Sequence, residues 1–306
     1  MSQLTFEPAV RKRMPLDELL DLSWQARQSS RPRVFEVVYP AGTLPVSVTG
    51  TECSLQCAHC GGRYLEHMAT VDSIDHVLSK KNITGILLSG GCDQAGQVPL
   101  VPSIGCVRRK LAETGRPFGI NVHPGIVGEQ EALEIADFAT VISFDFVLDD
   151  VTIQAAFGGY RTGRDYIRSF SNLRKGKAKV VPHILVGLYK GEIRGEYEAV
   201  EFLAREGVDE LIFIVFIPTP RTRWEHLPPP DVDEVLRLIA WARVQNPQAK
   251  ISLGCMRPKG KYREQLDPAA VKAGVDAMVL PHSQAVREAR DRGLAISRKE
   301  ECCAFD

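Results

Sequence analysis

Eight short apolar runs recur along this chain, and segments with helical character separate them. Val141–Phe146, Val180–Leu188 and Leu211–Ile217 are continuous and rich in β-branched residues. Runs of this length are typical of strands buried on both faces of a parallel sheet. The remaining runs are Val46–Thr49, Gly85–Leu88, Phe118–Val122, Ile251–Leu253 and Ala277–Leu280. The alternation of strand and helix predicts an α/β fold.

About eight repeats of strand and helix predict a TIM-type (β/α) barrel, complete or nearly complete, with six to eight parallel strands. Asp231–Asn246 and Gly195–Glu206 have the apolar spacing of the covering helices, and Gly207 is a stop signal. We expect the barrel to span residues 46–293. Residues 1–45 are predicted to form an N-terminal helical extension, with Leu16, Leu19, Leu20 and Trp24 at helical spacing, and residues 294–306 a C-terminal tail.

Composition excludes several classes of protein. The chain has 306 residues with 44% hydrophobic and 25% charged residues, and its formal net charge is zero. No net field therefore attracts nucleic acid or an anionic membrane. There is no stretch of about 18 apolar residues, and Met1–Met14 has no signal-peptide core. We expect a cytoplasmic enzyme whose cysteines stay reduced.

Three cysteines follow the first predicted strand at short spacing. Cys53, Cys57 and Cys60 form a Cys-x3-Cys-x2-Cys pattern. Three thiolates this close can hold a 4Fe–4S cluster and leave its fourth iron open to a small molecule. Zinc, a disulfide and unrelated buried thiols are the alternatives. Zinc requires four ligands, usually with a second Cys/His pair, and no Cys-x2-Cys or His-x3-His pair follows.

The stretch Thr51–Gly62 resembles the signature of the radical S-adenosylmethionine (SAM) superfamily. The resemblance implies that SAM chelates the open iron and that the reduced cluster cleaves it to a 5′-deoxyadenosyl radical. The protein then supplies binding and orientation. His59 stands where the family prefers an aromatic residue and is expected to pack against the adenine.

Ser89, Gly90 and Gly91 follow the second predicted strand. They resemble the glycine-rich motif through which this superfamily binds the SAM amino group with backbone carbonyls. The alternative is an ordinary strand-to-helix turn. The family often has glutamate next, whereas this chain has Cys92.

Polar residues end the next two predicted strands. Asn121 and His123 end the third strand, and Ser143 and Asp145 end the fourth. In a barrel these positions face the site at the carboxyl ends of the strands. Asn121, Ser143 and Asp145 are expected to reach a ribose hydroxyl or a carboxylate of SAM, although each can equally be a satisfied core polar group.

Two further motifs resemble SAM contacts of the superfamily. Gly191–Glu198 matches Gly-x-Ile-x-Gly-x-x-Glu, in which Ile193 would pack against the adenine and Gly195 would belong to the same cofactor site. Pro218 belongs to a proline-containing segment at the end of the sixth strand and would contact the adenine as well.

Five cysteines lie outside the triplet. Cys106 falls in a predicted helix and is interpreted as structural. Cys92 and Cys255 end predicted strands, while Cys302 and Cys303 lie in the tail. We predict that these four thiols hold a second, auxiliary iron–sulfur cluster, with the tail folded over the barrel mouth. Buried cysteines without a ligand role and a strained vicinal disulfide are the alternatives.

The stretches His59–Met68 and Ser89–Asp93 and the Cys302-Cys303 tail resemble the biotin synthase-like homologue group, one branch of which supplies a component of two-protein lipoyl synthases. That resemblance implies sulfur insertion into an octanoyl chain on a carrier protein or lipoyl domain, with the auxiliary cluster as the sacrificial sulfur donor. It also implies a second radical SAM protein and a ferredoxin- or flavodoxin-type electron donor as partners. The usual single-protein lipoyl synthase has an N-terminal Cys-x4-Cys-x5-Cys and a C-terminal Arg-Ser-Ser-Tyr, and this chain has neither.

Two other functions stay open at this point. The first is a different radical SAM reaction on a small molecule, with the auxiliary cluster as relay or anchor. The second is a non-catalytic barrel that binds a cluster or zinc. The sequence identifies no catalytic side chain beyond the ligands.

Overall fold

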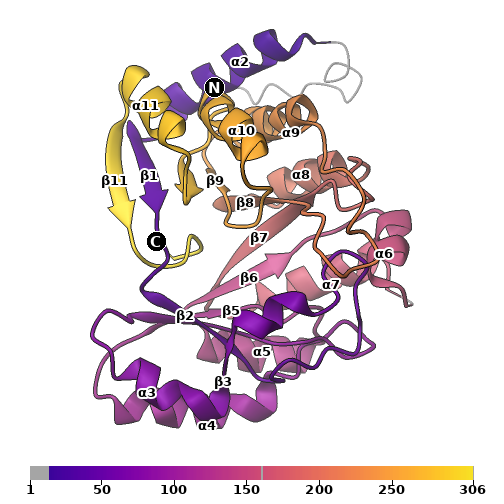
Figure 1. Cartoon of the computed structure of the whole chain (residues 1–306), viewed down its shortest axis with the longest axis vertical. Coiled ribbons are helices and arrows are strands. Elements are labelled where there is room, and N and C mark those ends of the chain that lie inside the picture. The colour runs from indigo at the N-terminus through magenta and orange to yellow at the C-terminus, as the bar shows by residue number, and fades with distance from the viewer. Residues whose placement is uncertain (1–13, 160, 306) are drawn as a thin grey trace. The chain divides into compact units, whose positions relative to one another are not determined.

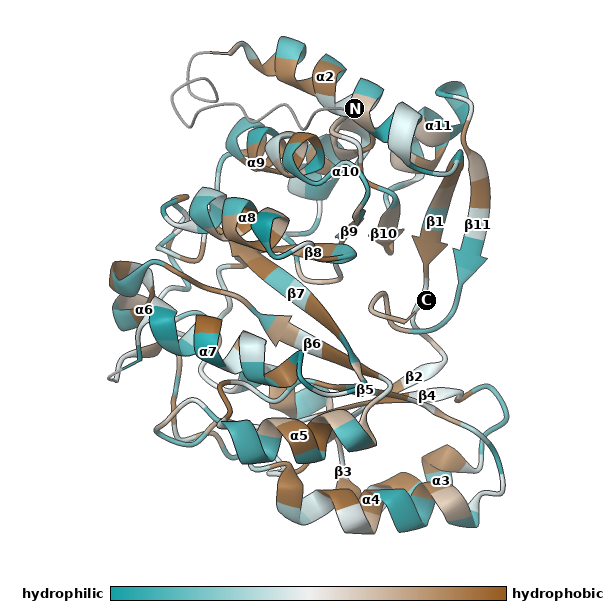
Figure 2. Cartoon of the chain, turned by 180° about the vertical axis from the view of Figure 1, so that it is seen from behind, coloured by the Kyte–Doolittle hydropathy of each residue, from teal (hydrophilic) through white to brown (hydrophobic). Residues whose placement is uncertain are grey.

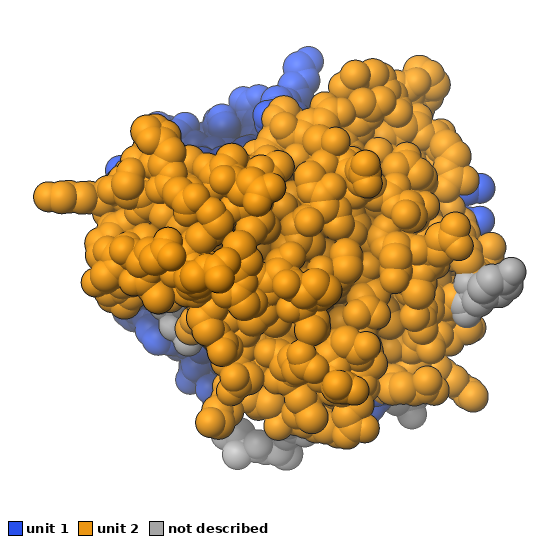
Figure 3. Space-filling view, turned by 90° about the horizontal axis from the view of Figure 1, so that it is seen from below, with its two compact units in different colours: residues 1–38, 184–217, 227–299 blue, residues 39–183, 218–226, 300–306 orange. Residues whose placement is uncertain are grey.

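The computed structural model describes residues 14–159 and 161–305 (Figure 1). The chain divides into two compact units, which Figure 3 distinguishes by colour. Unit 1 takes its residues from Met1–Val38, Ile184–Ile217 and Leu227–Lys299. Unit 2 consists of Tyr39–His183, Pro218–His226 and Glu300–Asp306.

Unit 2 is a parallel sheet with its connecting helices. Its strands are β2 (Thr43–Ser47), β3 (Ala69–Thr70), β4 (Gly85–Ser89), β5 (Gly119–Val122), β6 (Val141–Asp145) and the first part of β7 (Lys179–Val186). Its helices are η1 (Arg63–His67), η2 (Val71–Ser73), α3 (Ile74–Leu78), α4 (Val101–Glu113), α5 (Glu129–Phe138), α6 (Asp150–Phe157) and α7 (Gly163–Leu173).

Unit 1 is likewise built of parallel strands and helices. Its strands are the end of β7, β1 (Val34–Val38), β8 (Glu210–Val215), β9 (Lys250–Leu253), β10 (Ala277–Val279) and β11 (Ala295–Lys299). Its helices are α2 (Leu16–Ser30), α8 (Glu196–Arg205), α9 (Val232–Gln245), α10 (Lys261–Lys272) and α11 (Ser283–Asp291).

Hydrogen bonding orders the strands β11-β1-β10-β9-β8-β7-β6-β5-β4-β2-β3 in one 11-stranded sheet. The α/β class and the parallel pairing are therefore confirmed, but the complete or nearly complete barrel of six to eight strands is wrong. In the described part of the chain the order begins at β11 and ends at β3, and these two end strands do not pair with each other.

All eight predicted strands are present, and three further strands escaped sequence analysis. β1 lies in the segment expected to be a helical extension, and β11 lies in the expected tail. β11 pairs in parallel with β1 and carries Arg298 and Lys299, as edge strands often carry charges. Such a strand lacks the continuous apolar run by which buried strands are recognised. β3 is too short to show a pattern.

The predicted helices are confirmed where the structure describes them. α2 buries Leu19 on one face, but residues 1–13 of the predicted extension lie outside the described residues. Asp231 caps α9 by accepting hydrogen bonds from the backbone N–H groups of Asp233 and Glu234. In Figure 2 the helices carry both colours, whereas β1 and β7 are largely brown. No helix of the described residues is long and apolar enough to cross a membrane.

The carboxyl ends of four neighbouring strands of unit 2 lie side by side. Ser47 of β2 is in register with Ser89 of β4, and Leu88 is in register with Val122 of β5. Asp145 of β6 is in register with His183 of β7. In this parallel sheet the loops that follow these strands therefore emerge at one edge. Behind them, rings of Phe144, Phe146, Tyr166 and Phe170 pack with centroids 5.3–6.4 Å apart.

The C-terminal tail lies at the opposite edge of this sheet. The backbone N–H of Cys302 donates to Oγ1 of Thr43, the first residue of β2, at 2.8 Å. A Cβ added at Gly85 or Gly119, the first residues of β4 and β5, would stand 3.2 or 2.9 Å from the Phe305 ring. The prediction that the tail closes over the mouth is wrong, because the tail packs on the amino ends of these strands.

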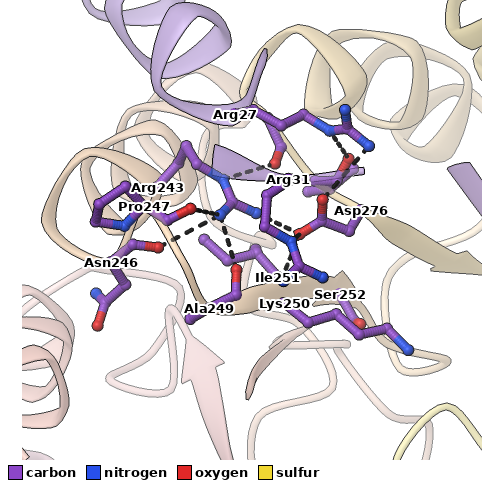
Figure 4. A network of polar contacts seen from close by, with 12 residues as sticks. Arg27, Arg31, Arg243, Asn246, Pro247, Ala249, Lys250, Ile251, Ser252 and Asp276 are labelled. Carbon is purple, nitrogen blue, oxygen red and sulfur yellow. Dashed lines mark hydrogen bonds and ion pairs between the residues drawn. The ribbon is translucent and has the colours of Figure 1, made fainter. Parts of the chain in front are cut away.

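A buried network of arginines surrounds one carboxylate in unit 1 (Figure 4). Arg27 and Arg31 approach Asp276 at 3.4 and 3.3 Å, and Arg243 also pairs with it. Arg243 is fully buried and donates to the carbonyls of Asn246 and Ala249 just beyond α9. Because α2, α9 and β10 all meet at this carboxylate, its charge holds three elements together.

We predict that Asp276→Ala destabilises the protein by about 3–5 kcal/mol, because it leaves buried guanidinium groups without their counter-charge. Denaturant unfolding measures the loss. Asp137→Ala is the control, because Asp137 pairs with Arg108 at 3.6 Å with both side chains more than half exposed, and exposed pairs contribute little. Equal midpoints for the two variants would contradict the prediction.

Candidate metal centre

The cysteine triplet lies on the loop that follows β2 in unit 2. The loop doubles back where Gln56, Gly61 and Gly62 take φ angles of 45°, 51° and 74°. The backbone N–H groups of Gly61 and Cys60 donate to the carbonyl of Cys57 at 2.8 and 3.3 Å. This tight turn places several potential ligands on one short segment.

The side chains that the loop gathers form a donor set for a metal. One ligand atom each from Cys57, His59 and Cys60 lies within 4.8 Å of the other two. The thiol of Cys53 donates to the carbonyl of Cys92 at 3.8 Å and interacts electrostatically with the Cys57 sulfur. Two of the three expected cluster ligands, Cys57 and Cys60, thus lie together with His59, and Cys53 lies on the same loop outside this 4.8 Å group. Thiolates are the ligands that iron–sulfur clusters take.

The thiols of Cys57 and Cys60 shift each other's pKa in opposite directions. A hydrogen bond between the sulfurs of Cys57 and Cys60 raises the pKa of Cys57 and lowers that of Cys60 to about 4. Burial adds to the shift at Cys57 and opposes it at Cys60, where the charge and hydrogen bond of His59 help to lower the pKa. The pair therefore shares one proton, which a metal would replace.

The turn after β4 packs directly on the triplet loop. A Cβ at Gly91 would stand 1.9 Å from the carbonyl oxygen of Glu52 and 2.6 Å from Cα of Cys53. The Gly91 N–H donates to Oγ1 of Thr49 at 2.7 Å, which fixes the approach. Only glycine permits this contact. The predicted proximity of Ser89–Gly91 to the triplet is therefore present in unit 2.

The carbonyl groups of this turn are not equivalent. The Ser89 carbonyl accepts from the N–H of Val48 at 2.8 Å, and the Cys92 carbonyl accepts from the N–H of Ser54 at 2.8 Å. Within the described part of the chain no donor reaches the carbonyl oxygen of Gly90 or Gly91. These two oxygens are available to a ligand that brings N–H groups, whereas that of Ser89 is not.

His59 packs against helix α6. Its ring meets the Phe157 ring edge-on at 5.7 Å and 86°. Its Nδ1 is buried and has no hydrogen-bond partner within the described residues. An unpaired buried nitrogen next to three thiols fits a site that a cofactor completes. The contact of His59 with an adenine stays a prediction.

Asn121 and Ser143 bond to each other rather than facing an open space. Asn121 is fully buried, and its Oδ1 accepts from the N–H and the hydroxyl of Ser143 at 3.2 and 3.0 Å. Its Nδ2 lies 3.4 Å from the sulfur of Cys302. The alternative of a satisfied core polar group therefore describes both residues better than a cofactor-binding role.

Asp145 forms an ion pair at the carboxyl edge of the sheet. Its Oδ2 lies 3.3 Å from Nε2 of His123, and both side chains are about one-third exposed (31% for His123 and 30% for Asp145). Burial opposes both charges, but their attraction outweighs it, so the pKa of His123 is raised and that of Asp145 is lowered. The two side chains therefore favour each other's charged forms, and solvent still reaches both.

His183 of β7 interacts with Asp145 and His123, and the sequence did not identify it as a candidate site residue. Burial lowers its pKa to about 4, so the ring is neutral. Its Nδ1 lies 3.1 Å from the carbonyl of Val181 and must donate there, which leaves Nε2 as an acceptor. Only the strand register could have indicated His183, because this residue pairs with Asp145 across neighbouring strands. An isolated histidine within an apolar run gave no such indication.

The other predicted SAM contacts fall in two places. Pro218 belongs to unit 2, where the hydroxyls of Thr219 and Tyr64 are hydrogen-bonded at 2.9 Å and join its segment to the loop after the triplet. Ile193 and Gly195 belong to unit 1. There the carboxylate of Glu196 accepts from the N–H groups of Gly187 and Arg194 at 2.8 and 2.7 Å, and so braces the loop that carries Ile193.

The four thiols of the predicted auxiliary cluster are not gathered by either unit. Cys255 is an exposed residue of unit 1. Within unit 2, Cys302 is anchored at the amino end of β2, whereas Cys92 follows the carboxyl end of β4. The expected union of Cys92 with Cys302 and Cys303 at the mouth is wrong, because the tail packs on the other edge of the sheet.

Solved structures with the same fold include methylornithine synthase (PylB), with a TM-score of 0.65 at 14% identity over 95% of this chain and 93% of that chain. HydG, a maturase of the [FeFe]-hydrogenase, matches with a TM-score of 0.68 at 13% identity over 96% and 70%. No family model and no curated protein matches the chain. At these identities the likeness shows that the chain shares the fold of these two proteins.

We predict that Gly91→Ala strongly lowers the iron bound after anaerobic reconstitution. The new methyl group would overlap the carbonyl of Glu52 and displace the triplet loop. Gly105→Ala is the matched control, because Gly105 lies in α4 with nothing within 4 Å of an added Cβ, and alanine favours a helix. Iron binding by Gly91→Ala equal to that of the control would refute the close contact.

Proposed function

We propose that this chain is a radical SAM enzyme in which Cys53, Cys57 and Cys60 hold a 4Fe–4S cluster. The observation that carries the proposal is the contact between the triplet loop and the Gly90–Gly91 turn, on a fold shared with radical SAM enzymes. The thiols supply three ligands, and the turn offers two unpaired carbonyls beside them. A bound 4Fe–4S cluster would supply the electron for reductive cleavage of SAM, and the cleaved SAM would supply the group that abstracts hydrogen from the substrate.

The residues of the chain bind and orient SAM. The carbonyls of Gly90 and Gly91 accept hydrogen bonds from its amino group, which brings N–H donors. His59 lies on the triplet loop, and Pro218 belongs to the segment that Tyr64 joins to it. In our proposal both contact the adenine. The adenine contact that the sequence motif implies for Ile193 and Gly195 stays a prediction. Asp145 and His123 then remain at the strand ends for a polar group of SAM or of the substrate.

Metal binding without catalysis is the second candidate. The donor atoms of Cys57, His59 and Cys60 within 4.8 Å of one another favour it, because sulfur and nitrogen ligands suit zinc. Metal analysis after anaerobic and aerobic purification separates the two. Iron with an equal amount of acid-labile sulfide supports the cluster, whereas one tightly bound zinc and no sulfide supports the second candidate.

The finer proposal is sulfur insertion into a C–H bond of an octanoyl chain, as in lipoyl synthesis. The resemblance of the cysteine pattern to the biotin synthase-like group motivates it. An octanoylated carrier protein or lipoyl domain, a second radical SAM protein and a ferredoxin- or flavodoxin-type donor are the proposed partners. The alternative is radical chemistry on another small molecule, with an auxiliary cluster as relay or anchor.

We predict that Cys57→Ala abolishes the formation of 5′-deoxyadenosine from SAM under dithionite, because the cluster loses one of three ligands. The fold should survive, since it depends mainly on apolar burial. Circular dichroism checks the fold, and liquid chromatography measures the product. Cys106→Ala removes a half-buried thiol of α4 in the same unit and should leave product formation unchanged. Product formation by Cys57→Ala at the wild-type level would refute the assignment.

Sulfur insertion makes a separate prediction about sulfide. With an octanoylated lipoyl domain, the second radical SAM protein and a ferredoxin system, turnover should consume acid-labile sulfide from this chain and add sulfur to the octanoyl group. A lipoyl domain without the octanoyl group is the control and should leave sulfide unchanged. Loss of SAM without loss of sulfide would instead favour the small-molecule alternative.

A further inference from the structure

Cys92 occupies a position that the proposed cofactor site does not yet use. It directly follows the Gly90–Gly91 turn at the carboxyl edge of β4. Glutamate is common there in the superfamily that the motif resembles, and cysteine is a far better iron ligand than glutamate. The tail thiols lie at the other edge of the sheet, so Cys92 needs another explanation than the one the sequence suggested.

The backbone of Cys92 is fastened to the triplet loop. Its carbonyl accepts from the N–H groups of Ser54 and Leu55 at 2.8 and 3.3 Å and from the thiol of Cys53 at 3.8 Å. The preceding Gly91 is buried against the backbone of Cys53. Residue 92 therefore cannot move away from the triplet without breaking several contacts at once.

The side chain of Cys92 lies in the electrostatic field of the same thiols. Burial, together with the charges of Cys53, Asp145 and Cys60, raises its pKa to about 12. The thiol of Cys57 in turn interacts with Cys92. All three triplet sulfurs are thus coupled to this fourth sulfur.

We propose that Cys92 is a fourth, exchangeable ligand of the triplet cluster, which occupies the open iron until SAM displaces it. This inference rests on the proposed function, since it requires a cluster with one open iron beside the Gly90–Gly91 turn. In this ligand exchange the Cys92 thiol releases one proton when its sulfur binds iron. The Cys92 sulfur takes up one proton when SAM replaces it on the iron. No electron is transferred in either direction.

The consequence is a cluster that is capped at rest. An iron without a protein ligand is the one that mild oxidation removes, which leaves a three-iron cluster with its own electron paramagnetic resonance signal. A sulfur ligand from Cys92 protects that iron. It also competes with SAM, so the apparent affinity for SAM falls by the fraction of molecules in which the iron is open.

The test compares reconstituted wild type, Cys92→Ala, Cys92→Ser and the control Cys106→Ala. Each is treated with ferricyanide with and without SAM, and the three-iron signal is measured. We expect several times more three-iron cluster in Cys92→Ala than in wild type or the control when SAM is absent. SAM should protect all four proteins equally. If about one-tenth of the wild-type molecules are open, calorimetry should show roughly tenfold tighter SAM binding by Cys92→Ala.

Other results separate the possible failures. Equal three-iron signals in wild type and Cys92→Ala overturn the inference and leave the proposed function intact. Lower iron in Cys92→Ala and Cys92→Ser before oxidation, without a rise in the three-iron signal, assigns Cys92 to a different cluster and also overturns it. A wild-type protein without iron and sulfide refutes the proposed function itself. The alanine and serine side chains leave the backbone bonds of residue 92 in place, and thermal unfolding of the two variants checks that the fold is kept.

Discussion

The contact between Gly91 and the backbone of Cys53 is the constraint on which the candidate site depends. An added Cβ there would stand 1.9 Å from the carbonyl of Glu52, so the two loops can meet only where the side chain is absent. The parallel register of β2 and β4 brings the loops to the same edge, and Thr49 and the carbonyl of Cys92 then tie them together. The thiols of a flexible loop thereby become a fixed donor set, as a cofactor site requires.

Behind this donor set the polar groups of unit 2 divide into two kinds. Asn121 and Ser143 form hydrogen bonds with each other inside the sheet. Their burial therefore costs little folding free energy, because their polar groups have partners. The Asp145 carboxylate lies 3.3 Å from His123, where solvent still reaches both side chains, and the neutral His183 interacts with the two. This charged edge suits a polar ligand group better than an alkyl chain, because burying an alkyl chain would remove the pair from water without offering it a partner. An octanoyl chain would therefore have to bind away from this pair.

The position of the tail separates its two cysteines from Cys92. Phe305 covers the first residues of β4 and β5, and Cys302 contacts Asn121 from the same side. Cys302 and Cys303 therefore belong to the packing of the amino edge, while Cys92 belongs to the carboxyl edge with the triplet. From the sequence alone these cysteines could belong to one metal site, but they lie at opposite ends of the parallel strands of unit 2.

The sequence by itself determined the α/β class, eight of the strands and the triplet. Buried strands leave continuous apolar runs such as Val141–Phe146, and metal ligands on one loop are close in the sequence as well as in space. Only the tertiary structure decided the rest. β1 has Glu36 within its apolar residues, and β11 is an end strand with Arg298 and Lys299, so neither shows a continuous apolar run. Strand register places His183 opposite Asp145. The tail packs on the amino edge because Gly85 and Gly119, which have no side chains, leave room for the Phe305 ring. Such choices depend on the packing of residues that are distant in sequence, which no local pattern records.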